Sequence, residues 1–259
     1  MSVIPGKIVL HRMGYYTDQA GIMRRYSAEE PSWAAHIEKS RELILRTIDL
    51  INPPAITVLG SGWLLDLPLE EMLENGRRIN LSDILLPHQV ENRIKTLSNV
   101  TFIKEDITGG LITGVYDNAR RGLLKHPADI TKILSYKPYE PHADAGLIIS
   151  LNLLSQLDSL PADYLRKKTL ISEEKIMEMR QKVQQQHVDM LRGRDSLLIT
   201  DFYEHLPGSY NEAEKKSTLA IDLPDGFLRE EWDWIFDTGR NYNPAATTVF
   251  RVAGIVFRR

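Results

Sequence analysis

The stretch from residue 56 to residue 83 limits what this chain can fold into more than any other part of the sequence. A short apolar run at residues 56–59 is followed at once by Gly60-Ser61-Gly62, and a helix-like segment then leads to a second apolar run that ends at Asp83. Glycines directly after a strand let the backbone come close to a bound ligand, and an acidic residue about 20 positions further on accepts hydrogen bonds from a ribose. The stretch therefore predicts a strand, a tight turn and a second strand that form a site for an adenosine-containing cofactor.

The alternation of strands and helices continues along the chain. Further strands are predicted at residues 78–82, 100–104, 145–150 and 196–200, and helices at residues 67–74, 87–97 and 173–191. Repetition of this kind implies a parallel sheet with right-handed crossovers. Residues 232–236 and 248–257 have no helix between them, so we expect them to pair antiparallel, with a bulge at Gly254. The expected fold is doubly wound α/β, with a mostly parallel, seven-stranded sheet that ends in an antiparallel hairpin.

The chain is expected to divide into an N-terminal extension, residues 1–52, and an α/β domain, residues 53–259, with an insertion at about 109–141. In the extension, residues 33–51 predict a helix that begins after Ser32. The aromatic and arginine side chains before it suit either a lid over the cofactor edge or packing against the sheet; they are Tyr15, Tyr16, Arg24, Arg25 and Tyr26.

Composition excludes several kinds of chemistry. The chain has no cysteine, which rules out disulfides, thiolate zinc sites and cysteine nucleophiles and fits a cytoplasmic protein. The formal net charge of −3 gives no support for nucleic-acid binding. None of the seven histidines has the spacing of a metal site, and no apolar run is long enough to span a bilayer. A small-molecule substrate is expected, and a homodimer is compatible with the sequence.

Together, five parallel strands closed by an antiparallel hairpin resemble the class I S-adenosylmethionine-dependent methyltransferases over residues 56–259. The first motif of that family is matched by Val58-Leu59-Gly60-Ser61-Gly62 and the second by Asp83. The third is matched by Asp106, in Phe102-Ile103-Lys104-Glu105-Asp106, and the fourth, in place, by Ser150-Leu151-Asn152.

The resemblance implies a role for each matched residue. Gly60, Ser61 and Gly62 would lie under the methionine part of the cofactor. Asp83 would bind the ribose hydroxyls and Asp106 the adenine amino group. Ser150 and Asn152 would line the site at the end of the fourth strand. The chain departs from the family pattern in having Val58 where an acid is usual and Leu64 where a third glycine is usual, while Asp66 follows closely and offers a carboxylate.

Each of these residues also has an ordinary structural interpretation. The glycines suit any tight strand-to-helix turn, and Asp83 or Asp106 suits a helix cap or a turn; Glu105 is an alternative to Asp106. The function that the resemblance implies is methyl transfer from S-adenosylmethionine to a small molecule, with S-adenosylhomocysteine as product. The alternatives are a non-catalytic binding protein of the same fold and, ranked lower because Leu65 stands where a third small residue is needed, a nicotinamide-dependent oxidoreductase.

Three residues beyond the fifth predicted strand are candidates for proton transfer. Tyr203, Glu204 and His205 follow Asp201, and an imidazole takes up a proton near neutral pH. A surface position for His205 is the simpler interpretation.

Overall fold

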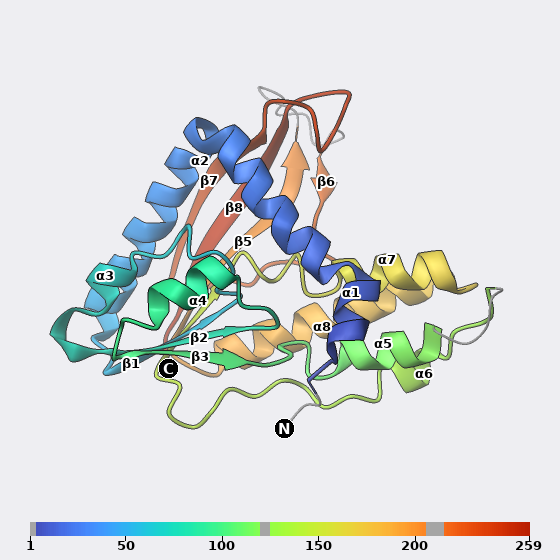
Figure 1. The fold of residues 1–259 in the computed structure, drawn as a ribbon, viewed down its shortest axis with the longest axis horizontal. Coiled ribbons are helices and arrows are strands. Elements are labelled where there is room, and N and C mark those ends of the chain that lie inside the picture. Colours follow the sequence, from blue (N-terminus) through green and yellow to red (C-terminus); the bar gives the residue numbers. More distant parts are fainter. Residues whose placement is uncertain (1–3, 120–124, 206–214) are drawn as a thin grey trace.

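Residues 4–119, 125–205 and 215–259 are described by the structure, a computed structural model (Figure 1). The helices of these ranges are α1 (Lys7–Met13), α2 (Tyr15–Ile51), α3 (Leu69–Met72), the 3₁₀ turn η1 (Glu74–Gly76), α4 (His88–Ile94), α5 (Leu111–Ala119), α6 (Ile130–Ile133), α7 (Ser159–Lys168) and α8 (Glu173–Arg192). The strands are β1 (Ala55–Leu59), β2 (Arg78–Asp83), β3 (Val100–Lys104), β4 (Leu147–Leu151), β5 (Ser196–His205), β6 (Lys216–Ser217), β7 (Leu228–Asp237) and β8 (Thr248–Phe257).

One mixed sheet organises the molecule. Its strand order is β3-β2-β1-β4-β5-β8-β7, and the two-residue β6 pairs with β5 off this path. Strands β1 to β5 are parallel, whereas β8 is antiparallel to both β5 and β7. All five residues of β1 and of β4 are buried, as expected for central parallel strands covered on both faces. The expected α/β architecture, mostly parallel with a C-terminal antiparallel hairpin, is confirmed.

Helices cover both faces of the sheet and one of its ends. On one face, Ile56 and Val58 of β1 pack with residues of α2, α3 and α4. On the other face, Leu59 and Ile148 pack with the second half of α8. A separate core forms where α1, α5, α6 and α7 meet the first half of α8 (Figure 1). The N-terminal extension therefore contributes to two cores, because α1 joins this helical layer while α2 crosses to the sheet.

Helix α2 consists of two helical segments joined at a kink, and the predicted helix at residues 33–51 is the second of them. The helix begins at Tyr15, well before Ser32, and contains Pro31. Pro31 lacks the N–H that an uninterrupted helix would use, and the chain leaves helical geometry at Glu29 (φ −119°, ψ 16°). Figure 1 shows α2 bending sharply between its two halves. Pro31 therefore lies in the first turn of the second half of α2, where a proline is tolerated. At the kink, the Glu29 carboxylate is bonded to the β7–β8 connection, as described below.

Three further details differ from the sequence expectations. Strand β5 continues past Asp201 to His205, because antiparallel pairing with β8 extends it beyond the parallel sheet. The helix expected at 67–74 is shorter, ending at Met72 before the 3₁₀ turn. Gly254 pairs regularly with both neighbours and is not a bulge. A Cβ there would lie 2.2 Å from Cδ2 of Leu43, so this glycine lets α2 pack closely on the sheet. Helix α7 was not predicted.

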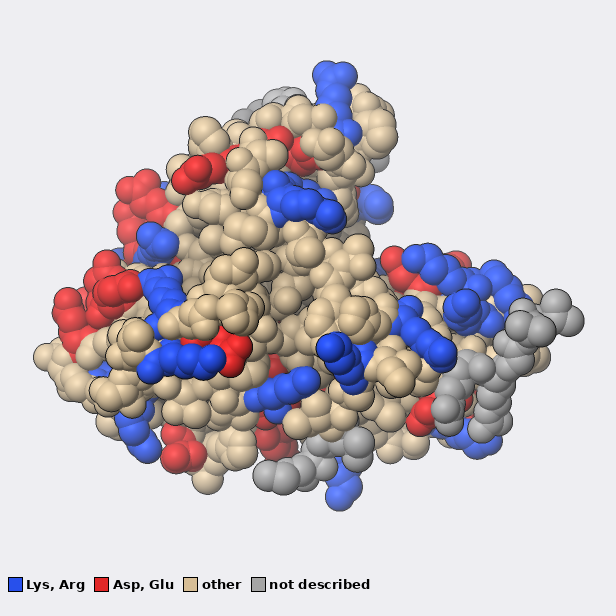
Figure 2. Space-filling view, viewed as in Figure 1, with Lys and Arg blue, Asp and Glu red and all other residues tan. Residues whose placement is uncertain are grey.

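Within the described ranges, no helix combines the length and the apolar character needed to cross a membrane. Acidic and basic side chains are interspersed over the face seen in Figure 2, and the middle of that face, where α2 passes, is mostly uncharged. The predicted division at residue 52 stays a prediction.

Candidate functional site

The predicted binding residues follow the carboxyl ends of neighbouring parallel strands. Gly60 follows β1, Asp83 ends β2, Asp106 follows β3, and Asn152 follows β4. The order of the strands reverses between β1 and β4, and ligands of open α/β sheets bind in the crevice outside the strand ends at such a point. The topology therefore gathers these residues at the edge where a ligand of this fold class binds.

The glycine turn is held tightly against its neighbours. Gly60 has φ 77°, and its N–H donates to the Ser82 carbonyl at 2.9 Å. A Cβ at Gly60 would lie 3.0 Å from Leu153 Cβ, so this glycine serves the packing of the turn on the end of β4. Gly62 has φ 49°, and a Cβ there would meet only the Gly60 carbonyl oxygen, at 3.8 Å, which leaves space beside the turn.

Asp83 ties the turn to the end of β2. Its Oδ2 accepts the Gly62 N–H at 2.9 Å, and its Oδ1 accepts the N–H groups of Ile84 at 2.7 Å and Leu85 at 3.4 Å. Burial raises the pKa of Asp83, and the Gly62, Leu85 and Ile84 amides oppose that rise. A carboxylate has about four acceptor sites, so capacity for a ligand hydroxyl remains beside this turn-holding role.

Asp106 combines a turn with an unused oxygen. Oδ1 accepts from the Thr108 N–H at 3.0 Å and from the Thr108 hydroxyl at 2.5 Å. The residue is 0% exposed, so Oδ2 is shielded from water, and Oδ2 accepts no hydrogen bond of ordinary geometry from the described part of the chain. Burial raises the pKa of Asp106 to about 6, against the opposing effect of the Thr108 side chain and amide and of the Gly110 amide. Glu105, the alternative acid, is already bonded by Ser82 and by the Tyr139 hydroxyl.

The end of β4 carries two polar networks. Ser150 Oγ lies 2.8 Å from His187 Nε2 on α8, and burial lowers the pKa of His187 to about 4, so this imidazole is neutral at physiological pH. Asn152 has φ 47°, and its Nδ2 donates to Asp66 Oδ2 at 2.7 Å. Both of these site residues are thus held by partners that the fold brings from distant parts of the chain.

His36 completes the network around Asn152. Its Nε2 lies 3.3 Å from Asn152 Nδ2 and 3.7 Å from Asp66 Oδ2. Its Nδ1 lies 3.1 Å from Trp232 Nε1, which can only donate, so Nδ1 accepts this hydrogen bond. His36 is fully buried and joins α2 and β7 to the crevice between β1 and β4. Its role was not predicted, because its partners are far away in sequence.

Leu64, which stands where the family pattern has a third glycine, and its neighbour Trp63 both pack against the core on the α2 side of the sheet. Leu64 has φ 59° and is 3% exposed, and it packs in the core on the α2 side of the sheet. The Trp63 indole donates to the Gln19 carbonyl at 2.8 Å, and the Gln19 side chain donates to the Leu85 carbonyl at 3.4 Å. The first half of α2 is therefore fastened to the glycine turn and to the loop after Asp83.

Tyr203, Glu204 and His205 lie away from this crevice. Ile199 is the β5 partner of Leu151, and His205 is six residues further along, or about 20 Å at about 3.3 Å per residue. His205 Nε2 lies 3.4 Å from Asp233 Oδ1, in a group of charged side chains on β7 and β8 that includes Arg251. The structure does not bring these three residues together with the glycine turn, and their catalytic role stays a prediction.

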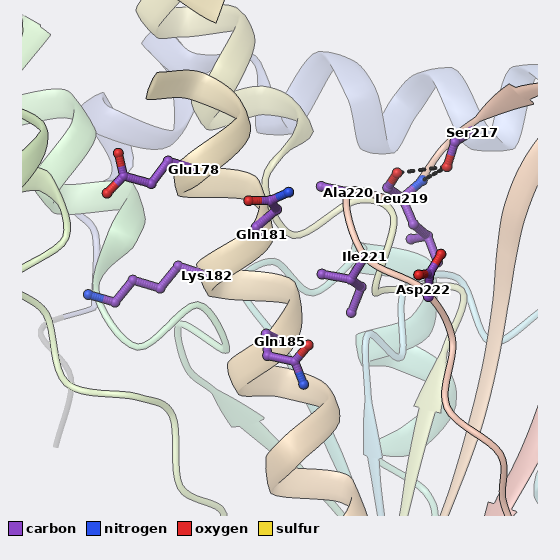
Figure 3. A pocket seen from close by; sticks show the side chains of 9 residues that line it. All are labelled: Glu178, Gln181, Lys182, Gln185, Ser217, Leu219, Ala220, Ile221 and Asp222. Atoms are coloured by element: carbon purple, nitrogen blue, oxygen red, sulfur yellow. Dashed lines mark hydrogen bonds between the residues drawn. The ribbon is translucent and has the colours of Figure 1, made fainter. Parts of the chain in front are cut away.

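An open groove of about 750 Å³ lies elsewhere, between α8 and residues 217–222 (Figure 3). Figure 3 shows Gln181 and Gln185 on the side of α8 that faces Ala220 and Ile221. None of the predicted site residues lines this groove. Within the described ranges, no group of three or more histidine or acidic side chains is arranged to hold a metal ion.

Comparison with known proteins adds little to this geometry. No family model matches the chain, and no curated protein matches it. Among solved structures, the methyltransferase domain of bacterial CtHen1-CN is similar over 85% of this chain and 99% of that chain, with 8% identity and a TM-score of 0.36. A likeness this distant carries no argument about function, so the fold assignment depends on the sheet itself.

Proposed function

We propose that the chain binds S-adenosylmethionine and transfers its methyl group to a small molecule. The observation that carries this proposal is the unpartnered, fully buried Oδ2 of Asp106 at the carboxyl edge of the sheet. A buried polar atom without a partner costs about 1–3 kcal/mol, and a native fold that keeps one commonly has a use for it. An amino group of a ligand satisfies this acceptor.

The residues at the edge fit the cofactor in three respects. The acceptor of Asp106 suits the adenine amino group, and the remaining capacity of Asp83 suits a ribose hydroxyl. At Gly62, next to which the methionine part would lie, an added carbon would meet only the Gly60 carbonyl oxygen, at 3.8 Å. The carboxylates Asp66, Asp83 and Asp106 also favour a ligand with a positive charge.

When bound, the cofactor supplies a sulfonium methyl group that is open to in-line displacement. The chain's contribution is to hold the donor and the acceptor substrate in line, which is mainly an effect of proximity. Helix α2, fastened over the turn through Trp63 and Gln19, would keep water out of the crevice. A proton acceptor is needed only when the acceptor substrate is poorly ionised, and Asp66 lies nearer the crevice than His205 does.

Calorimetric titration with S-adenosylmethionine and S-adenosylhomocysteine tests the proposal. We expect micromolar binding of both ligands, loss of binding in Asp106→Ala, and unchanged binding in Asp195→Ala. Asp195 is the matched control, because this aspartate precedes β5 at the opposite edge of the sheet and accepts the Arg259 N–H. Equal affinity in the wild type and Asp106→Ala, or no binding by the wild type, contradicts the assignment.

The same titration addresses a second function, that of a non-catalytic protein with this fold. One observation favours it: both Asp83 oxygens already hold backbone amides, and the helix after the glycine turn has only the four residues of α3. A chain that has given up the ligand would use these groups for its own structure. If a folded wild-type protein binds neither ligand, the result supports this alternative.

A further inference from the structure

Two buried polar atoms near the turn after β3, one an acceptor and the other a possible donor, have no hydrogen-bond partner in the described part of the chain. Asp106 Oδ2 is an acceptor without a donor, and the Tyr136 hydroxyl is also buried and without a partner in the described part of the chain. Asp106 belongs to the segment after β3, whereas Tyr136 lies at the far end of the insertion, after α6. Leaving both unsatisfied is costly, so their presence together needs an explanation.

The backbone around Asp106 is built to receive the segment that carries Tyr136. A Cβ at Gly110 would lie 3.4 Å from Tyr136 Cβ. A Cβ at Gly109 would lie 2.2 Å from the Lys137 carbonyl oxygen and 2.9 Å from the Tyr139 nitrogen. The two glycines therefore allow residues 136–139 to lie directly against the turn that Asp106 begins. Contact at this distance places Cβ of Tyr136 beside Gly110, at the end of the turn that Asp106 begins.

The protonation state of each group determines whether it donates or accepts a hydrogen bond. Burial, with a smaller contribution from the nearby Asp106 carboxylate, raises the pKa of Tyr136, so the phenol keeps its proton and is able to donate. Lys182 donates to the Leu134 carbonyl at 3.0 Å, and its ammonium lies 5.9 Å from the centre of the Tyr136 ring. The Tyr136 ring thus lies beside the Lys182 side chain, while its hydroxyl has no partner in the described ranges.

We infer that Tyr136 and Asp106 together recognise one edge of the adenine ring, with the Tyr136 hydroxyl donating to N1 and Asp106 Oδ2 accepting from the N6 amino group. This inference rests on the proposed function. Adenine presents an acceptor and a donor side by side on this edge, which is the complement of the pair of unpartnered atoms. Hypoxanthine presents the reverse order, a donor at N1 and an acceptor at position 6. Tyr136 is therefore a specificity-determining residue supplied by the insertion.

Both atoms are covered in this structure, so a ligand reaches them only when adjoining side chains shift. Tyr15 is one such side chain. It lies one helical turn before Gln19 and hence on the same face of α2, which faces Leu85 and Trp63. Entry of adenine would require the Tyr15 side chain, whose pKa is raised by burial and by the nearby Asp106 carboxylate, to shift.

The test compares S-adenosylhomocysteine with S-inosylhomocysteine, in which hypoxanthine replaces adenine. Affinities are measured by calorimetry for the full-length wild type, Tyr136→Phe and Tyr139→Phe. Tyr139 is the matched control, because it lies in the same segment and its hydroxyl is already bonded to Glu105 Oε1 at 2.7 Å. We expect the wild type to prefer the adenine ligand at least about 100-fold, since a site built to hydrogen-bond a group rejects analogues that lack it.

Removal of the Tyr136 hydroxyl is expected to weaken binding of the adenine ligand about tenfold and to reduce the preference by a similar factor. Tyr139→Phe should leave the preference unchanged. An unchanged preference in Tyr136→Phe overturns the inference while the proposed function stands. Equal binding of the two ligands by the wild type also overturns it, whether or not the variant folds. No binding of either ligand overturns both.

Discussion

Two buried carboxylates in this molecule, Asp106 at the carboxyl edge of the sheet and Glu29 at the kink of α2, differ in how fully their oxygens are hydrogen-bonded. Asp106 is 0% exposed and Glu29 is 4% exposed, so both have left water. Oε1 of Glu29 accepts the N–H groups of Thr238 and Gly239, each at 2.9 Å, and Oε2 accepts the Thr238 hydroxyl at 2.8 Å. Asp106 has one oxygen bonded and one without a partner.

The pKa shifts of the two groups follow from this difference. Burial alone would raise the pKa of Glu29, but the Gly239 and Thr238 hydrogen bonds outweigh it and the pKa is lowered. For Asp106, burial outweighs the Thr108 bonds and the pKa rises to about 6. Burial therefore does not mark a functional acid. What separates Asp106 from Glu29 is the supply of hydrogen-bond donors around the carboxylate.

The largest expected effect comes from Glu29→Ala. This change leaves two backbone N–H groups and a hydroxyl without an acceptor at the β7–β8 connection and removes the contact between that connection and the kink of α2. We expect the free energy of unfolding to fall by about 3–4 kcal/mol at pH 7, measured by urea denaturation. Glu30→Ala is the control, because Glu30 is exposed and accepts only the Tyr26 hydroxyl at 3.3 Å. A loss below about 1 kcal/mol would mean that Glu29 does not hold the kink.

Asp106→Asn is expected to change stability in the opposite direction. Because the folded pKa lies above the unfolded value of 3.8, the folded state binds the proton more tightly, and its stability falls as the pH rises from about 4 to about 6. The ionised carboxylate therefore costs at most about 3 kcal/mol at pH 7, since one pKa unit corresponds to about 1.4 kcal/mol. The asparagine avoids this cost but adds an N–H group that needs an acceptor, so we expect a net gain of about 1–2 kcal/mol.

Measurements at two pH values separate this prediction from a simple packing effect. At pH 7 the variant should melt at a higher temperature than the wild type, and at pH 4 the difference should nearly vanish, because Asp106 of the folded wild type is then protonated. Tyr15 and Tyr136, the titratable neighbours of Asp106, stay neutral over this range, because burial raises the pKa of each. A variant that is less stable than the wild type at pH 7 would show that the unpartnered oxygen does not destabilise the folded state.

The parallel part of the sheet was predictable from the sequence, and the reason is local. Residues 100–104 and the start of α8 at Glu173 follow directly from apolar runs and helix signals, which depend only on neighbouring residues. The placement of Gly60, Asp83 and Asp106 at one edge follows from the same alternation, because parallel strands end on the same side. Pattern alone was therefore enough for the architecture and for the position of the crevice.

The features that the sequence did not predict depend on contacts between segments that are far apart in the chain. The sequence indicated the second half of α2 but not the first half, from Tyr15 to the kink at Glu29, nor that Glu29 finds partners 209 and 210 residues away. His36 and Asp66 meet Asn152 only in the folded chain. Tyr136 had one faint signal in the sequence, the adjacent pair Gly109-Gly110, which is typical of a close backbone approach. Nothing local indicated which segment would approach.

The smallest expected effect extends the comparison from carboxylates to hydroxyls. Ser155 Oγ donates to Asp201 Oδ1 at 2.6 Å, whereas Ser61 Oγ, in the glycine turn, is buried without a partner in the described part of the chain. Ser155→Ala should lower the free energy of unfolding by about 1–2 kcal/mol, because the buried Asp201 carboxylate loses a donor. Ser61→Ala should change it by less than about 0.5 kcal/mol, because no hydrogen bond is lost. In the presence of saturating S-adenosylhomocysteine, Ser61→Ala should become the more destabilising of the two substitutions if Ser61 bonds the ligand. The Tm increase on adding ligand would then be smaller in Ser61→Ala than in Ser155→Ala, whereas equal increases would assign Ser61 to the turn alone.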